Sequence, residues 1–108
     1  MFRYKNDFVW NDVREMMATT LPWDRLDNKC CLVTGANGMI ATYVVYLLIS
    51  LVRERRINIH VIALSRNRQR SEELFADFLD DPHFELLTQD VCMPIHLEGR
   101  LDYIFHFA

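Results

Sequence analysis

A short apolar segment at residues 30–33 runs directly into a turn that contains two glycines and then into a long apolar segment with helical character. Gly35 and Gly38 are two of the only three glycines in the 108 residues. A strand that passes through such a tight turn into a helix leaves the first N–H groups of the helix without partners in the chain. This junction constrains the fold more than any other feature of the sequence.

The remainder of the chain alternates short apolar strands with helical segments. Strands are predicted at 30–33, 59–64, 84–87 and 101–107, and helices at 38–56 and 71–79. Asn58 is predicted to follow the first helix in a left-handed conformation, and Ser71 to cap the second. Alternation of this kind implies parallel strand pairing and right-handed crossovers, so the predicted fold is a doubly wound α/β sheet.

The first 28 residues precede this alternation. Val9, Val13, Met16 and Met17 have the spacing of one helix face, and Pro22 would end that helix. We therefore expect two parts, an amino-terminal helical extension at 1–28 and an α/β domain at 29–108.

Charge and composition exclude several classes of protein. Twelve Lys and Arg stand against fifteen Asp and Glu, so no overall positive field would attract nucleic acid or an anionic membrane. The longest apolar stretch, 39–52, is shorter than a membrane span, and residues 1–10 do not resemble a signal peptide. Neither the three cysteines nor the histidines have metal-ligand spacing. The expected protein is cytoplasmic, without nucleic-acid, membrane or metal binding.

The glycine turn predicts a phosphate site. Gly35 would permit the tight turn, Gly38 would let a pyrophosphate approach the backbone, and Ala41 would allow close packing of the helix on the strand. The free N–H groups and the helix dipole both favour an anion there. The turn lacks the Gly-Lys-Ser/Thr ending of a nucleoside-triphosphate loop. A dinucleotide is therefore the expected ligand.

Residues 34–41 fit the pattern Thr-Gly-x-x-Gly-x-x-Ala. This resembles the glycine motif of the short-chain dehydrogenase/reductase family, and most of all its extended, nucleotide-sugar epimerase/dehydratase branch. Segments 61–67, 89–91 and 103–108 agree with that branch, so the resemblance covers roughly Leu26 to Ala108. It implies a partial NAD(P)-binding Rossmann domain at 29–108, truncated after about four strands.

The resemblance also implies roles for particular residues. Asp90 would hydrogen-bond the adenine amino group and Val91 would pack on the ring, although Asp90 could instead cap the loop after its strand. Phe107 and Ala108 would lie along the ribose and nicotinamide. The pyrophosphate would meet the turn itself, at Gly35, Ala36, Asn37, Gly38, Met39 and Ile40.

One position departs from the NAD-binding pattern. A carboxylate usually holds the adenosine ribose at the end of the second strand, but this chain has Ser65 and Arg66 there. Arg66, helped by Arg68 or Arg70, could bind a ribose phosphate in a bidentate manner. The resemblance thus points to NAD and the local chemistry to NADP, with NAD slightly favoured because arginine can also stack on adenine.

Members of this family use a Tyr-x-x-x-Lys pair for proton transfer, and no such spacing occurs in this sequence. We therefore predict no catalytic residue and expect the chain to be an inactive amino-terminal fragment of an epimerase or dehydratase, whose nucleotide-sugar would bind only to the complete enzyme. A non-catalytic NAD(P) sensor and a structural protein with an incidental glycine turn are the alternatives. The open edge of the last strand predicts self-association.

Overall fold

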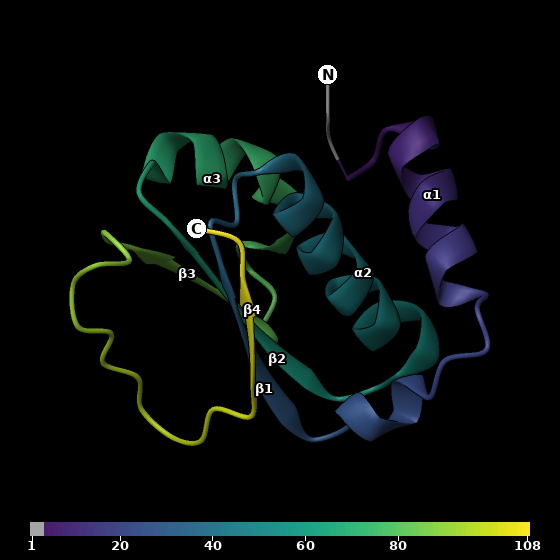
Figure 1. The fold of residues 1–108 in the computed structure, drawn as a ribbon. Helices are drawn as coiled ribbons and strands as arrows, with labels where there is room; N and C mark the ends of the chain where they lie inside the picture. Colours follow the sequence, from purple (N-terminus) through teal and green to yellow (C-terminus); the bar gives the residue numbers. More distant parts are fainter. Residues whose placement is uncertain (1–3) are drawn as a thin grey trace.

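The apolar segments that follow one another in the sequence pair in parallel, and the order across the sheet is β3-β2-β1-β4. The computed structural model describes residues 4–108 (Figure 1). Its elements are α1 (Asp7–Met17), η1 (Trp23–Leu26), β1 (Lys29–Thr34), α2 (Met39–Arg55), β2 (Ile59–Ser65), α3 (Arg68–Leu74), η2 (Ala76–Phe78), β3 (Phe84–Thr88) and β4 (Tyr103–His106). The predicted parallel α/β sheet is confirmed.

The chain leaves the centre of the sheet in one direction and then returns to the other side. It runs outward from β1 through α2 to β2 and through α3 to β3, and then crosses back so that β4 pairs with the free edge of β1. Thr34, the last residue of β1, is opposite Leu64 of β2 and His106 of β4. The direction of winding therefore reverses between β1 and β4, at the carboxyl ends of both strands.

The two faces of the sheet are covered differently. Alternate residues of β1 point to opposite faces, so Cys31 and Val33 pack under the helices while Leu32 faces the other way. That second face carries a smaller apolar cluster, closed by Val91 and other apolar side chains of the irregular connection 89–102. Within residues 4–108 the helices lie on one face, so the second helical layer of a doubly wound sheet is not among the elements described here.

The predicted amino-terminal helix is present and packs against α2 (Figure 1). Val9, Val13 and Met17 are buried in the same core as the sheet, as their spacing predicts. The guanidinium of Arg55 donates a hydrogen bond to the Met17 carbonyl at 2.7 Å, which attaches the carboxyl end of α1 to that of α2. No helix within the described part of the chain has the length and apolar character needed to cross a membrane.

Two predicted helix boundaries are wrong. Arg56, not Asn58, takes the left-handed conformation after α2, with φ of 55°, and the turn returns Ile57 to the core. Helix α3 starts at Arg68 and ends at Leu74, because Asn67 caps it by accepting from the Arg70 N–H at 3.1 Å. Ser71 lies inside this helix, buried, and a separate short turn, η2, follows.

Asp81 joins the end of the helical layer to the start of β3. Its carboxylate accepts hydrogen bonds from the His83 N–H at 2.9 Å and from the Arg53 guanidinium at 3.1 Å. Partial burial acts to raise the pKa of Asp81, but the hydrogen bonds from His83 and Arg53 and the charge of Arg53 outweigh it, so the pKa lies below its ordinary value. The ionised form is therefore favoured in the folded protein.

This arrangement predicts how stability depends on pH. The contribution of Asp81 is complete above the pKa of the unfolded chain, about 3.9, and is lost as the pH falls through the lower pKa of the folded state. We expect Asp81→Asn to destabilise the protein at pH 7 and to change stability much less near pH 2. Urea unfolding of both proteins across this range measures the effect, and a destabilisation that is the same at both pH values would contradict it.

Candidate functional site

The glycine turn is held from both neighbouring strands. Gly35 has φ of +62°, and a Cβ at this position would lie 2.9 Å from the Phe107 carbonyl carbon and 2.9 Å from the Ala108 nitrogen. On the other side, the Ala36 N–H donates to the Leu64 carbonyl at 3.0 Å. The turn thus packs between the chain that leaves β4 and the end of β2, which defines its position at the carboxyl edge of the sheet.

Helix α2 begins at this turn with its first N–H groups free of helical partners. Its first amide hydrogen bond runs from Thr42 to the Gly38 carbonyl at 2.8 Å, so the N–H groups of Met39, Ile40 and Ala41 precede the helical ladder. The buried Thr42 hydroxyl lies 2.7 Å from the Gly38 carbonyl oxygen and 2.8 Å from that of Ala36. Thr42 therefore ties the helix start to the turn.

The backbone at Gly38 is open on its outer side. Its φ is −68°, which any residue adopts, and an added Cβ would meet only the Gly35 carbonyl oxygen, at 3.4 Å. Ala41, one turn further along, is buried, in agreement with the predicted close packing of helix on strand. A side chain at position 38 would thus extend into open space beside the start of α2.

A network of polar side chains links the turn to the loop after β2. The Ser71 hydroxyl donates to Asn37 Oδ1 at 2.7 Å and lies 3.0 Å from the Asn67 carbonyl. It also contacts the Ser65 hydroxyl. Asn37 Nδ2 in turn donates to the Asn67 carbonyl at 3.2 Å. Asn67 and Ser71 were not predicted as parts of the site, because their contacts with the turn join residues that are 30 or more positions apart in the chain.

A cavity of about 330 Å³ lies between the turn and that loop. It brings together many of the residues that the sequence singled out, and adds others from β2 and α3. Its lining consists of Gly35, Asn37, Gly38, Leu64, Ser65, Arg66, Asn67, Arg70, Val91 and Ala108. Segments that are far apart in the sequence thus form one recess beside the start of α2.

The other predicted residues lie around this cavity rather than in its lining. Ala36 is fully buried beneath the turn, whereas Met39 and Ile40 expose their side chains at the start of α2. Phe107 donates its N–H to the Thr34 hydroxyl at 3.1 Å, and its side chain is partly exposed. The backbone N–H groups of Ala36 and Phe107 are already hydrogen-bonded within the chain, to Leu64 and Thr34, and of the two side chains that of Phe107 is the exposed one.

Asp90 makes a hydrogen bond within the loop that follows β3, which was the alternative to the predicted contact with adenine. Its Oδ1 accepts a hydrogen bond from the Cys92 N–H at 2.8 Å. This bond, together with the nearby charge of Arg66, holds the pKa of Asp90 below its ordinary value. Asp90 therefore stays ionised at neutral pH and stabilises the loop after β3, next to Val91.

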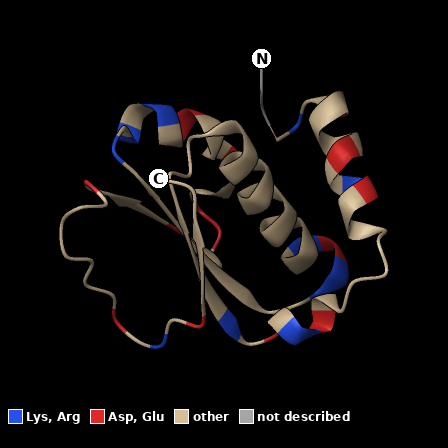
Figure 2. Ribbon diagram, in the orientation of Figure 1, with Lys and Arg blue, Asp and Glu red and all other residues tan. Residues whose placement is uncertain are grey.

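The three arginines after β2 make different contacts. Arg66 and Arg70 line the cavity, whereas Arg68 Nε binds Glu72 Oε1 at 2.8 Å, one turn along the same helix. Figure 2 shows basic residues on α3, near the carboxyl end of the chain. The cavity-lining residues include two arginines and no acidic side chain.

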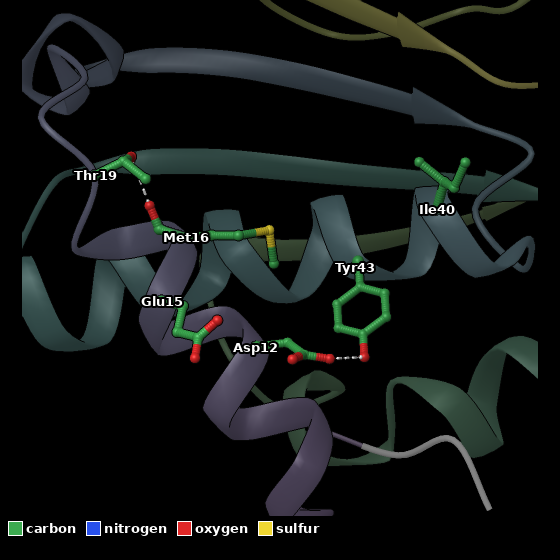
Figure 3. A pocket seen from close by; sticks show the side chains of 6 residues that line it. All are labelled: Asp12, Glu15, Met16, Thr19, Ile40 and Tyr43. Carbon is green, nitrogen blue, oxygen red and sulfur yellow. Dashed lines mark hydrogen bonds between the residues drawn. The ribbon is translucent and has the colours of Figure 1, made fainter.

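A larger hollow of about 590 Å³ lies between α1 and the amino-terminal half of α2 (Figure 3). It is lined by Asp12, Glu15, Met16, Thr19, Ile40 and Tyr43. The Tyr43 hydroxyl donates to Asp12 Oδ2 at 2.7 Å, and this hydrogen bond to a carboxylate raises the pKa of Tyr43. A tyrosine that transfers protons near neutral pH needs the opposite shift, so Tyr43 is unsuited to that role.

Among residues 4–108, no group of three His, Cys, Asp or Glu side chains is placed to hold a metal ion. Comparison with known proteins does not extend the assignment: no protein-family model matches the chain, and a search of curated proteins finds no match. The resemblance to the short-chain dehydrogenases therefore depends on the motif residues and on the parallel sheet that carries them.

Proposed function

We propose that this chain binds an adenine dinucleotide at the edge of the sheet where β1 and β4 end. The observation that carries the proposal is the position of the glycine turn, which lies where the direction of winding reverses. In open α/β sheets, ligands bind in the crevice outside the carboxyl ends of the strands at such a switch point. The free N–H groups at the start of α2 lie at this same place.

The residues present fit a dinucleotide part by part. The pyrophosphate would lie against Gly38, where the backbone is open, and would accept hydrogen bonds from the first N–H groups of α2. The adenosine would occupy the 330 Å³ cavity between Val91 and the end of β2. The nicotinamide half would extend past Ala108, the residue that packs against Gly35.

We propose that this chain alone binds the dinucleotide but does not catalyse a reaction. We assign it as the dinucleotide-binding portion of an NAD(P)-dependent nucleotide-sugar epimerase or dehydratase, in which the nicotinamide supplies hydride transfer at a sugar carbon. The 108 residues contain no Tyr-x-x-x-Lys spacing. Among the residues that line the cavity there is also no tyrosine, histidine or acidic side chain to move a proton.

The second candidate is a non-catalytic NAD(P)-sensing module, and the same cavity lining supports it. Both candidates bind the dinucleotide, so binding does not separate them. Incubation of the purified chain with dinucleotide and a panel of nucleotide-sugars, followed by NMR of the sugar products, tests for turnover, because the hydride returns to the sugar and no net NADH accumulates. The open reading frame of the gene separates the candidates, because a Tyr-x-x-x-Lys segment encoded in it would favour the enzyme.

Gly38→Val tests the binding site directly. Calorimetric titration of the chain with NAD and with NADP should show saturable binding, and the valine should weaken it at least about ten-fold, or ~1.4 kcal/mol. The reason is that its side chain would fill the approach to the N–H groups, while its Cβ would meet only the Gly35 carbonyl oxygen, at 3.4 Å. The fold should therefore survive, which circular dichroism can verify.

Leu79→Val serves as the matched control, because Leu79 is exposed and lies just after η2, near the start of β3 rather than near the turn. It should leave binding unchanged. Either of two results would overturn the proposal: a folded wild-type chain that binds neither dinucleotide, or binding that Gly38→Val does not weaken.

A further inference from the structure

We infer that the hollow between α1 and α2 is a docking site for a helical segment of a partner protein, one with apolar residues on one face and lysine or arginine beside them. The hollow has a volume of about 590 Å³ and takes its lining from both helices. No residue lines both this hollow and the cavity beside the glycine turn. The docking site is therefore separate from the proposed dinucleotide site and does not depend on it.

Helix α1 has a second stripe of side chains besides the one that it buries. Val9, Val13 and Met17 form the buried stripe. The members of the second stripe recur three or four positions apart, so they follow one side of the helix and of the turn after it. They are Phe8, Asp12, Glu15, Met16 and Thr19. Phe8 is 81% exposed, which shows that the chain itself leaves the start of this stripe uncovered.

Helix α2 supplies the other wall of the hollow. Ile40 and Tyr43 are three residues apart in its first turns and therefore share a face. Ile40 is 69% exposed, although its side chain is wholly aliphatic. In Figure 3 the Met16 side chain lies between the two helices, and Asp12 and Tyr43 point toward each other. Their hydrogen bond of 2.7 Å joins the two walls, so the hollow has its shape without an occupant.

The charges around the hollow are all negative. Asp12 and Glu15 are the only charged residues of its lining, and both are exposed. Arg14, the basic residue in the last turn of α1, lies on another side of the helix, because it is separated from Glu15 by about 100° of rotation. An apolar groove with carboxylates at its rim is complementary to a segment that combines apolar anchors with cationic side chains.

The walls favour a helix as the occupant. Along the interior of α1 and α2 the backbone groups are bonded within their own helices, so the hollow offers no free edge to an added strand. Recognition must then use side chains, and a third helix places residues at i, i+3, i+4 and i+7 into the groove between two others. The stripe from Phe8 to Thr19 is about 16 Å long, which matches roughly three helical turns.

Titration of the 108-residue chain with a labelled synthetic peptide, followed by fluorescence anisotropy, tests this docking site. The probe is a capped helix of about 15 residues with leucine at i, i+3, i+4 and i+7 and lysine on both sides of that face. A scrambled peptide of the same composition and a peptide with glutamate in place of lysine are the control probes. We expect the first peptide to bind saturably and at least about ten-fold more tightly than either control. Added salt should weaken it.

Variants of the chain locate the binding. Ile40→Gln and Met16→Gln should each weaken the lysine peptide at least about five-fold, because each removes apolar surface from the interface. Glu15→Gln should weaken it about two-fold at low salt and reduce the salt dependence. Met93→Gln and Glu98→Gln make the same kinds of change at exposed positions of the connection after β3, and should leave binding unchanged. Circular dichroism verifies that each variant folds.

Three results would overturn the docking site: no binding of the lysine peptide, equal binding of the scrambled peptide, or binding that neither Ile40→Gln nor Met16→Gln weakens. Equal binding of the glutamate peptide would overturn the basic character of the occupant. Sedimentation of the chain alone tests a different occupant. A dimer that Ile40→Gln dissociates and Met93→Gln does not would assign the hollow to a second copy of this chain, and would overturn its assignment to a basic helix.

Discussion

Replacing Tyr46 with alanine is expected to lower the free energy of unfolding by about 3–5 kcal/mol, the usual cost of removing a large buried aromatic side chain. Tyr46 is fully buried at the centre of an aromatic cluster. Its ring centroid lies 5.2 Å from that of Tyr4, 5.7 Å from that of Phe78 and 6.0 Å from that of Phe75. Its hydroxyl donates to the Leu74 carbonyl at 2.7 Å. Denaturant unfolding measures the loss.

Two further variants separate the contributions of Tyr46. Tyr46→Phe keeps the ring contacts and removes the hydroxyl that donates to the Leu74 carbonyl, so it should destabilise by about 1–3 kcal/mol. Tyr43→Ala removes a tyrosine from the same helix at a position outside the buried core, and should have a smaller effect than Tyr46→Ala. Equal losses for Tyr43→Ala and Tyr46→Ala would show that the aromatic cluster does not stabilise the fold as described.

Gly35→Ala is expected to destabilise the protein by about 2–5 kcal/mol, from two separate causes. The left-handed φ of +62° costs a residue with a Cβ about 1–2 kcal/mol. The new Cβ would also lie 2.9 Å from backbone atoms of Phe107 and Ala108, and crowding of this kind costs about 1–3 kcal/mol. Hydrogen exchange should show that β4 loses protection, because the chain that follows it must move.

The other two glycines provide the controls. Gly99 also has a positive φ, +85°, but nothing lies within 4 Å of an added Cβ, so Gly99→Ala should show the conformational cost without the crowding. Gly38→Ala has neither problem and should be close to neutral for stability. If Gly35→Ala and Gly99→Ala destabilised the protein equally, the contact between the turn and the end of β4 would have no energetic role.

The helices and strands of this fold were predictable from the sequence because each has a local signal. Apolar runs bounded by polar residues indicated the four strands, and the spacing of Val9 and Val13 indicated α1 and the face that it buries. The predicted boundaries of two helices were wrong because a different nearby residue formed the cap or the turn. Asn67 capped α3 four residues before Ser71, and the burial of Ile57 placed the left-handed turn at Arg56.

The candidate site could be predicted only in part for the same reason. The turn at Gly35 and Gly38 is one continuous segment, and its glycines indicate its conformation directly. The contribution of the loop after β2 is not contiguous with it, and Asn37 meets Asn67 and Ser71 only once β1 and β2 have paired. The contacts of Arg66, Arg68 and Arg70 also differ, because Arg68 pairs with Glu72 while Arg66 and Arg70 line the cavity, a difference that sequence spacing alone did not resolve.

The amino-acid sequence by itself determined the parallel α/β class, the amino-terminal helix and the position of the glycine turn, because apolar periodicity and glycine placement act within a few residues. The tertiary structure alone decided the strand order, with β4 beside β1, and therefore the reversal of winding at the glycine turn. It also decided that Gly35 packs against the chain after β4. These features depend on contacts between segments some 70 residues apart, which no local pattern records.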